Sequence, residues 1–238
     1  GLMAAVLARD GFTGAERIFD GPQGMAAGMS SDANPACLTD RLGLRWALAE
    51  TSFKYHASCR HTHPAADALL QVMREHSLQA SHIARVETHV HQGAIDVLGP
   101  VVKPSTVHQS KFSMGTVLAL AALHGHAGLG EFDRHFSADD TRDFCERVSM
   151  TLDPEVDAAY PQRWIGKVTV HTRDGRTLKG RVDEPKGDPG NTLNRDEITD
   201  KAMRLAAHSH GAQPDEMRHA LEQLWGITRV RHVGRLLP

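Results

Sequence analysis

The stretch KVTVHTRDGRTLKGRV, residues 167–182, is the clearest structural signal in this sequence. Val168 and Val170 alternate with polar residues, which is the pattern of a strand with one buried face. Asp174 and Gly175 then form a dipeptide typical of tight turns between antiparallel strands, and a second run returns after it. These residues predict a β-hairpin, so the fold contains antiparallel sheet.

The segments on either side of the hairpin add one more strand and several helices. Residues 83–91 alternate: Val86, Thr88 and Val90 share one side, and charged or histidine residues share the other, which predicts a half-buried strand. Apolar periodicity and capping residues predict helices at residues 1–10, 13–18, 63–76, 113–124, 139–148, 197–208 and 214–225. Helices come first and last with an α+β segment between them, so the predicted class is α+β.

Length, charge and cysteine content exclude several classes of protein. The chain has 238 residues, with 40% apolar and 24% charged, which is typical of a globular protein. A net charge of -2 gives no basic field, so neither nucleic acid nor a membrane surface is an expected partner. No apolar run approaches the roughly 20 residues of a membrane helix. Three scattered cysteines argue against a disulfide framework and for the cytoplasm.

The first predicted helix has a C-terminal cap residue but no N-terminal cap residue. Gly11 is a good C-terminal cap, whereas no capping residue stands before the apolar run that starts at Leu2. We therefore expect that part of the fold lies upstream of Gly1.

The stretch SFKYHASCRHTHPAAD, residues 52–67, places one lysine, one cysteine, one arginine and three histidines within ten residues. A metal site is one interpretation, because alternation in an extended segment would place Cys59, His61 and His63 on one face. His89 and His91 could add ligands. Both lie on the polar face of the predicted strand, however, so we expect them to be exposed to solvent. With 16 histidines in the chain such pairs arise by chance, and no metal is predicted.

Two other interpretations of residues 52–67 stay open. In the structural one, the stretch is a polar loop in which His61 or Thr62 satisfies the first N–H groups of the following helix. In the catalytic one, Lys54 and a histidine share proton transfer, and Arg60 grips a carboxylate. Lys111 would face the same anion.

The same stretch resembles a known protein family. FKYHASCRHTHPAADAL is similar to the run in the MmgE/PrpD family where a lysine precedes a histidine that opens a helix. The likeness continues through AAVLARDGFTGAERIFDGPQG, KFSMGTVLALAALHG, and YPQRWIGKVTVHTRDGRTLKGRVDEPKGDPGN followed by DEITDKAMRLA. These segments cover nearly the whole chain in the family's order.

The resemblance implies a fold and a domain division. Members combine a large all-helical domain with a smaller α+β lid domain, they tend to be homodimers, and they are nearly twice this length. The resemblance therefore implies a C-terminal half: residues 1–40 are a remnant of the helical domain, 41–190 the lid, and 191–238 helices that return to the helical domain. The family's Asp/Thr/His group and second lysine would lie upstream.

The resemblance also implies an activity. The family includes 2-methylcitrate dehydratase, cis-aconitate decarboxylase and iminodisuccinate epimerase, which move protons next to carboxylates without a metal or cofactor. The expected function is thus a lyase or isomerase that acts on small di- or tricarboxylic acids. The alternative is a non-catalytic, oligomerising lid fragment that lacks the N-terminal catalytic half.

Individual site residues carry over by position. Lys54 matches the family's active-site lysine, and His63 matches the histidine that begins the helix. Cys59 stands where decarboxylase-like members carry a histidine, which disfavours decarboxylation unless His56 or His61 substitutes. Ser113 matches the serine at a helix start, while Thr116 stands where many members place a tyrosine. Arg60 and Lys111 remain candidate carboxylate contacts.

Overall fold

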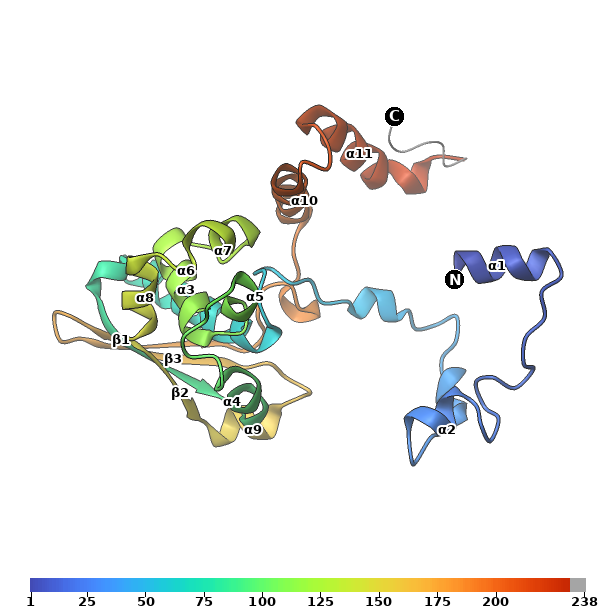
Figure 1. Ribbon diagram of the computed structural model, residues 1–238, viewed down its shortest axis with the longest axis horizontal. Helices are drawn as coiled ribbons and strands as arrows, with labels where there is room; N and C mark the ends of the chain where they lie inside the picture. Colours follow the sequence, from blue (N-terminus) through green and yellow to red (C-terminus); the bar gives the residue numbers. More distant parts are fainter. Residues whose placement is uncertain (232–238) are drawn as a thin grey trace. The chain divides into compact units, whose positions relative to one another are not determined.

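The computed structural model describes residues 1–231 and divides them into two compact units, residues 1–50 and the chain from Thr51 onward (Figure 1). The last seven residues of the predicted segment 191–238 lie outside the described residues. The proposed division into remnant, lid and returning helices stays a prediction.

One four-stranded mixed sheet organises the second unit. Its strands are β1 (Ile83–Val90), β2 (Val148–Leu152), β3 (Gly166–Thr172) and β4 (Thr177–Val182), in the spatial order β2-β1-β3-β4. β3 and β4 form the predicted antiparallel hairpin, β1 is antiparallel to β3, and β2 is parallel to β1. With helices around this sheet, the α+β class is confirmed (Figure 1).

Alternation along the strands gives the sheet one apolar face. Val86 and Thr88 lie opposite Val170 and Val168 across the β1–β3 ladder, and all four side chains are buried. Helix α3 (His63–Glu75) packs on β3 and β4, and α6 (Met114–His124) packs on α3, β2 and α8 (Asp139–Cys145). Figure 1 shows these helices gathered on one side of the strands. The core therefore lies between this sheet face and α3 and α6.

Close approach of α3 to the hairpin depends on two glycines. A Cβ atom on Gly166 would lie 2.1 Å from the carbonyl oxygen of Pro64. One on Gly180 would lie 2.6 Å from that of Ala68. Both distances are far below van der Waals contact, so only glycine lets the helix backbone rest on the strands.

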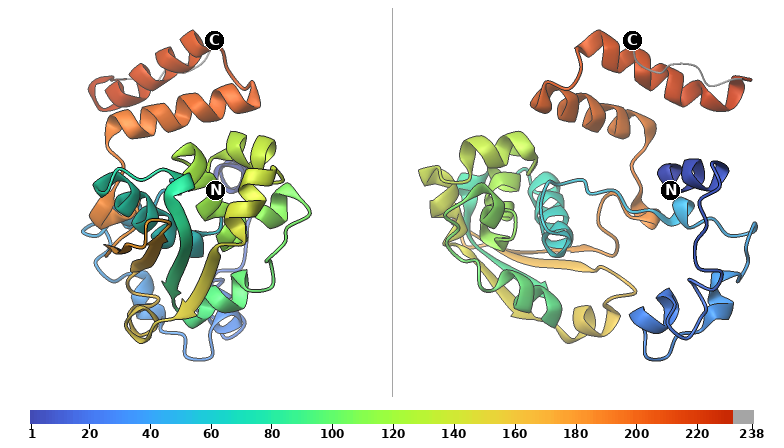
Figure 2. Two further views of the ribbon diagram at one scale, coloured as in Figure 1. Left: turned by 90° about the vertical axis from the view of Figure 1, so that its left-hand side faces the viewer. Right: turned by 45° about the vertical axis from the view of Figure 1, so that its right-hand side comes forward.

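The ends of the main helices follow from local sequence. The hydroxyl of Ser113 accepts the N–H of Thr116 at 3.2 Å and caps α6, and Gly125 ends that helix with a positive φ of 75°. Asn194 and Glu197 form a reciprocal capping box at the start of α10 (Arg195–Ser209). α10 packs beside α11 (Pro214–Gly226), as both views in Figure 2 show.

Shorter elements complete the second unit. The 3-10 turns are η3 (Arg60–Thr62), η4 (Ala80–His82), η5 (Pro189–Asn191) and η6 (Ile227–Arg229). The short helices are α4 (Gln92–Leu98), α5 (Val107–Ser110), α7 (Leu129–His135) and α9 (Pro154–Ala159). Among residues 1–231, no helix is both long and apolar enough to cross a membrane.

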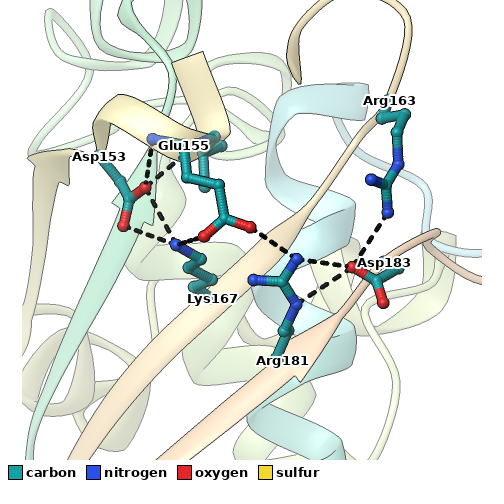
Figure 3. Close-up of polar contacts among 7 residues, drawn as sticks. Asp153, Glu155, Arg163, Lys167, Arg181 and Asp183 are labelled. Atoms are coloured by element: carbon teal, nitrogen blue, oxygen red, sulfur yellow. Dashed lines mark hydrogen bonds and ion pairs between the residues drawn. The ribbon is translucent and has the colours of Figure 1, made fainter. Parts of the chain in front are cut away.

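A charge network ties α9 to the polar face of the sheet. Lys167 on β3 donates to Asp153 at 3.0 Å and contacts Glu155, and Arg181 on β4 donates to Glu155 and Asp183, both at 2.8 Å (Figure 3). Hydrogen bonds from Arg181 and then Lys167 lower the pKa of the Glu155 carboxyl to about 2. Alternation therefore gives one sheet two different faces, one apolar and one ionic.

The first unit is built from short, exposed elements: α1 (Leu2–Arg9), α2 (Met25–Met29), η1 (Pro35–Leu38) and η2 (Ala47–Glu50). The helix predicted at residues 13–18 is wrong, since the structure has turns there. This segment of six residues, which includes Gly14, is too short to sustain a helix without a surface to pack on.

A second error concerns the helix predicted at residues 139–148. α8 ends at Cys145, and Val148 already belongs to β2, a strand that was not predicted. β2 forms the edge of the sheet, and its side chains are only half-buried or exposed, so its alternation is weak. Its pairing with β1 depends on residues about 60 positions away, which a local pattern does not contain.

Candidate functional site

The segment that carries the candidate catalytic residues is irregular but firmly held. The N–H of Phe53 donates to the carbonyl oxygen of Gly187 at 2.8 Å. Ala57 and Cys59 donate in the same way to Ala127 and Lys111, each at 2.8 Å. Three separate loops thus fix its backbone, which is the support that a precise site on a loop requires.

His56 is fully buried and oriented by both of its ring nitrogens. Nδ1 accepts the backbone N–H of Ala127 at 3.3 Å, so Nε2 carries a hydrogen and donates to Asp67 at 3.2 Å. The other carboxylate oxygen of Asp67 accepts the N–H of Lys186 at 2.6 Å. Asp67 therefore joins α3, the segment before it and the loop after the hairpin.

His63, the first residue of α3, is buried and remains neutral. Burial first, and then the nearby charges of His56, Lys54 and Arg60, together lower its pKa to about 3. Its ring lies edge-on to that of His56, with centroids 5.4 Å apart. Nε2 is buried and has no hydrogen-bond partner among the described residues.

A third histidine, His126, completes this cluster. Its ring centroid lies 5.4 Å from that of His56, and Nε2 contacts the carbonyl oxygen of Tyr55 at 3.1 Å. Burial lowers its pKa as well. Lys54, by contrast, is exposed, and its charge acts on His63. The structure thus places the predicted Lys54 and His63 within electrostatic reach of each other.

Arg60 and His61 lie in a second, aromatic cluster. The guanidinium of Arg60 forms an ion pair with Asp188 and stacks 4.8 Å from the ring centre of Trp164. Nδ1 of His61 contacts Nε2 of His91 at 3.1 Å, and burial lowers the pKa of His61. Arg60 is therefore already occupied by a carboxylate of the chain itself.

The expectation that His91 is solvent-exposed is wrong. Its side chain is buried and stacks on Tyr160 with ring centroids 3.8 Å apart. Burial and the adjacent His61 lower the pKa of His91 to about 4. The strand ends at Val90, so His91 leaves the alternating pattern and turns into the cluster. His89 stays on the strand and is half-buried.

The remaining predicted residues lie around the start of α6. Ser113 and Thr116 are buried, their hydroxyls are 3.1 Å apart, and both approach the sulfur of Cys145 at 3.9–4.0 Å. Lys111 holds the N–H of Cys59 through its carbonyl oxygen, and its ammonium lies 5.8 Å from the ring centre of Phe132. In this structure Ser113 and Thr116 act as a helix cap.

The geometric premise of the metal interpretation fails. Arg60–Thr62 forms the 3-10 turn η3 and His63 begins α3, so Cys59, His61 and His63 do not alternate along an extended segment. Within residues 1–231, no group of three or more His, Cys, Asp or Glu side chains is placed to hold a metal ion.

The sequence pattern did not predict which residues contact the two clusters: Asp67, His126, Tyr160, Trp164 and Asp188. One local signal existed, since Asp67 falls one turn after His63, on the side of α3 that also carries buried residues. The pairing of Arg60 with Asp188 joins positions 128 residues apart and leaves no local trace.

The fold and the site together describe an α+β domain in which the rings of His56, His63 and His126 gather near the start of α3. The chain belongs to the MmgE/PrpD family, because residues 56–227 match the family's C-terminal domain. The cis-aconitate decarboxylase-like protein oryM of Aspergillus oryzae is 27% identical over 224 residues. That match covers 87% of this chain and 46% of the relative, so the chain spans about half of that protein's length.

Proposed function

We propose that the protein is an MmgE/PrpD-type lyase or isomerase that moves a proton next to a carboxylate in a small di- or tricarboxylic acid. The observation that carries the proposal is His63, a buried neutral imidazole whose Nε2 has no partner among the described residues and whose pKa is lowered in part by the charge of Lys54. Family membership supports the lyase-type class.

The two residues take complementary roles. The ammonium of Lys54 binds a substrate carboxylate, which stabilises the negative charge that develops when the adjacent carbon loses its proton. Nε2 of His63 is the proposed acceptor of that proton. Because a pKa of about 3 makes it a weak base in the free protein, the transfer requires that the bound substrate carboxylate raise that pKa. The reaction then ends in one of two ways. Either the neighbouring hydroxyl group leaves and takes the proton held by His63 to form water, or a second proton-transfer group on the opposite side of the carbon returns a proton to its other face.

The neighbouring residues act on these two groups. The dyad of His56 and Asp67 positions the segment that carries Lys54, while Arg60, held by Asp188, adds positive potential near His63. Lys111, Ser113 and Thr116 remain proposed substrate contacts, and Cys59 and His61 remain proposed proton-transfer residues.

Dehydration and isomerisation come first among the reactions, and decarboxylation second. The name of the relative points to decarboxylation, whereas the resemblance implies that Cys59 stands where some decarboxylase-like members carry a catalytic histidine. A thiol is a weaker general acid–base than an imidazole near neutral pH.

A turnover screen tests the proposal. The chain is incubated with 2-methylcitrate, citrate, cis-aconitate and iminodisuccinate, and products are followed by NMR. We expect turnover of at least one acid, and a loss of about 10²–10⁴-fold in Lys54→Ala. The control is Lys179→Ala, an exposed lysine on β4. A folded protein without turnover, or equal rates in both variants, would contradict the proposal.

A second candidate is a non-catalytic module that associates with itself. It is favoured by the large apolar side chains exposed in residues 1–50, among them Leu42, Leu44, Trp46 and Leu48. A homodimer is proposed under either function. Sedimentation velocity tests it: one species at twice the 26.0 kDa chain mass is expected, and a monomer would overturn it.

We further propose a cytoplasmic protein that needs neither metal nor cofactor. Its three cysteines are unpaired, as a reducing compartment would leave them. Turnover that is unchanged after treatment with EDTA is the expected result, and a loss restored by zinc would overturn the proposal.

A further inference from the structure

One face of α10 carries three basic residues and one leucine. Lys201, Arg204, Leu205 and His208 follow the spacing i, i+3, i+4, i+7, which puts them on one side of the helix. All four line a single pocket, together with residues of α7 and of the loop before it. Lys201 on this face is half-buried, whereas Arg204, Leu205 and His208 are exposed.

The pocket is large enough for a small metabolite. Its volume is about 340 Å³, at the lower end of the roughly 300–1,000 Å³ typical of small-molecule sites. Besides the face of α10, its walls include Tyr55, His126, Glu131 and Arg134. Among the charged groups that line it, the cations therefore outnumber the single carboxylate of Glu131.

Most of these charges already have partners. Glu131 lies 3.4 Å from Arg134 and also accepts the N–H of Gly128. Arg204 donates through Nε to Asp200 at 2.8 Å, and His208 lies 3.3 Å from Asp133. Lys201, in contrast, pairs with no carboxylate among residues 1–231.

Lys201 is a half-buried cation with no carboxylate partner in the part of the chain that the structure describes. Burial, and then the neighbouring charge of Arg204, lower the pKa of its ammonium, so these surroundings disfavour the charged form of Lys201. Its Nζ donates to the carbonyl oxygen of Lys54 at 2.7 Å, so two of its three hydrogens remain available. A partly desolvated cation is stabilised by an anion brought to it.

Arg204 adds a second donor from the same face. Nη1 of Arg204 lies 3.2 Å from Nδ1 and 3.3 Å from Nε2 of His126. The ring of His126 also donates through Nε2 to the carbonyl oxygen of Tyr55, and its Nδ1 lies 3.5 Å from Glu131. Within the described residues the hydrogen bonds of Arg204 use Nε and Nη1, which leaves Nη2 for a ligand. Two cationic donors one helical turn apart suit the oxygens of an oxyanion.

We propose that the pocket between α7 and α10 binds a small metabolite through a carboxylate or phosphate group held by Lys201 and Arg204. Because Lys201 also holds the carbonyl oxygen of Lys54, a bound anion fixes the segment that carries that residue. The site is defined by binding alone, so it stands whether or not the proposed reaction is found.

Calorimetric titration of the 238-residue chain with citrate and with inorganic phosphate tests the site. At least one anion is expected to bind, and binding should weaken with rising salt. Lys201→Met and Arg204→Met should each weaken it by about ten- to a hundredfold, the effect of losing a charged hydrogen bond. Lys179→Met, which removes an exposed lysine elsewhere, should leave it unchanged.

The outcomes are distinct from those of the turnover screen. Citrate bound much more tightly than phosphate identifies a carboxylate ligand, and the reverse identifies a phosphate ligand. Saturation by neither anion at millimolar concentration overturns the proposal, as does binding that the two α10 variants leave unchanged. Circular dichroism of each variant confirms that α10 is still folded. Binding without turnover would count against the proposed function alone.

Discussion

Residues 1–50 and the chain from Thr51 onward contain the same kinds of apolar residue and bury them very differently. Phe12 and Trp46 in the first unit are each 69% exposed, whereas Phe132 and Phe144 in the second are 0% and 1% exposed. The difference shows that apolar content does not by itself make a core. A core also needs a surface to pack on, and in the second unit that surface is the sheet.

The two units also differ in where their chemistry lies. All 16 histidines follow residue 50, and so do all the candidate site residues. The candidate site therefore lies in the unit that has the core. Burial in that unit is the largest cause of the lowered pKa values of His63 and His91.

The largest expected contrast comes from the same substitution made in each unit. Phe132→Ala removes a fully buried ring and should lower the free energy of unfolding by about 3–5 kcal/mol. Phe12→Ala removes an exposed ring and should change it by less than about 0.5 kcal/mol. Urea denaturation measures both free energies of unfolding. A similar loss in the two variants would contradict the difference in burial between the two units.

A smaller contrast comes from adding one methyl group. Gly166→Ala forces a Cβ against the carbonyl oxygen of Pro64, so it should destabilise the second unit by about 1–3 kcal/mol. Gly28→Ala, inside α2 with open space around it, should be neutral or slightly stabilising. Thermal unfolding of the two variants checks this, and an undisturbed Gly166→Ala would mean that α3 does not rest on β3.

The pH dependence should originate in the second unit. His63 has a folded pKa of about 3 against an ordinary value near 6.5. Between these values the unfolded chain binds the extra proton, so stability falls as pH drops from about 6.5 toward 3. NMR of the imidazole, assigned by its absence in His63→Gln, should show no titration above about pH 4. A midpoint near 6.5 would place His63 in solvent.

The smallest effect is expected from the charge network on the exposed face of the sheet. The pKa of Glu155 is lowered to about 2, so its ion pairs stabilise the fold above about pH 4.5 and are lost as pH falls toward 2. Glu155→Gln should flatten the acid limb of the unfolding curve. Glu16→Gln, in the first unit, should leave that limb unchanged, and equal curves for all three proteins would show that the network contributes nothing.

Local patterns were enough to predict much of the fold. The hairpin, α3, α6, α10 and α11 were predicted because alternation, periodicity and capping are properties of neighbouring residues. β2 was missed because its partner β1 lies about 60 residues earlier. The predicted α+β class survived this omission, since the hairpin and β1 already required a sheet.

The site could be predicted only in part, for the same physical reason. Residues 52–67 stood out by composition, and the structure places Lys54 and His63 near each other. What the individual residues contact could not be read from the sequence. Asp67 binds His56 within the stretch, but Ala127, Lys186 and Asp188 reach it from distant loops. Burial of His91 likewise depends on Tyr160, about 70 positions later.

The most direct test of the central claim is exchange of substrate hydrogens in heavy water. The chain is incubated with each of the four acids, and NMR follows deuterium uptake at carbons next to a carboxylate. If Lys54 and His63 move a proton there, at least one acid will exchange, and exchange will vanish in Lys54→Ala but persist in Lys179→Ala. A folded protein that exchanges no acid, or exchanges equally in both variants, would contradict the account.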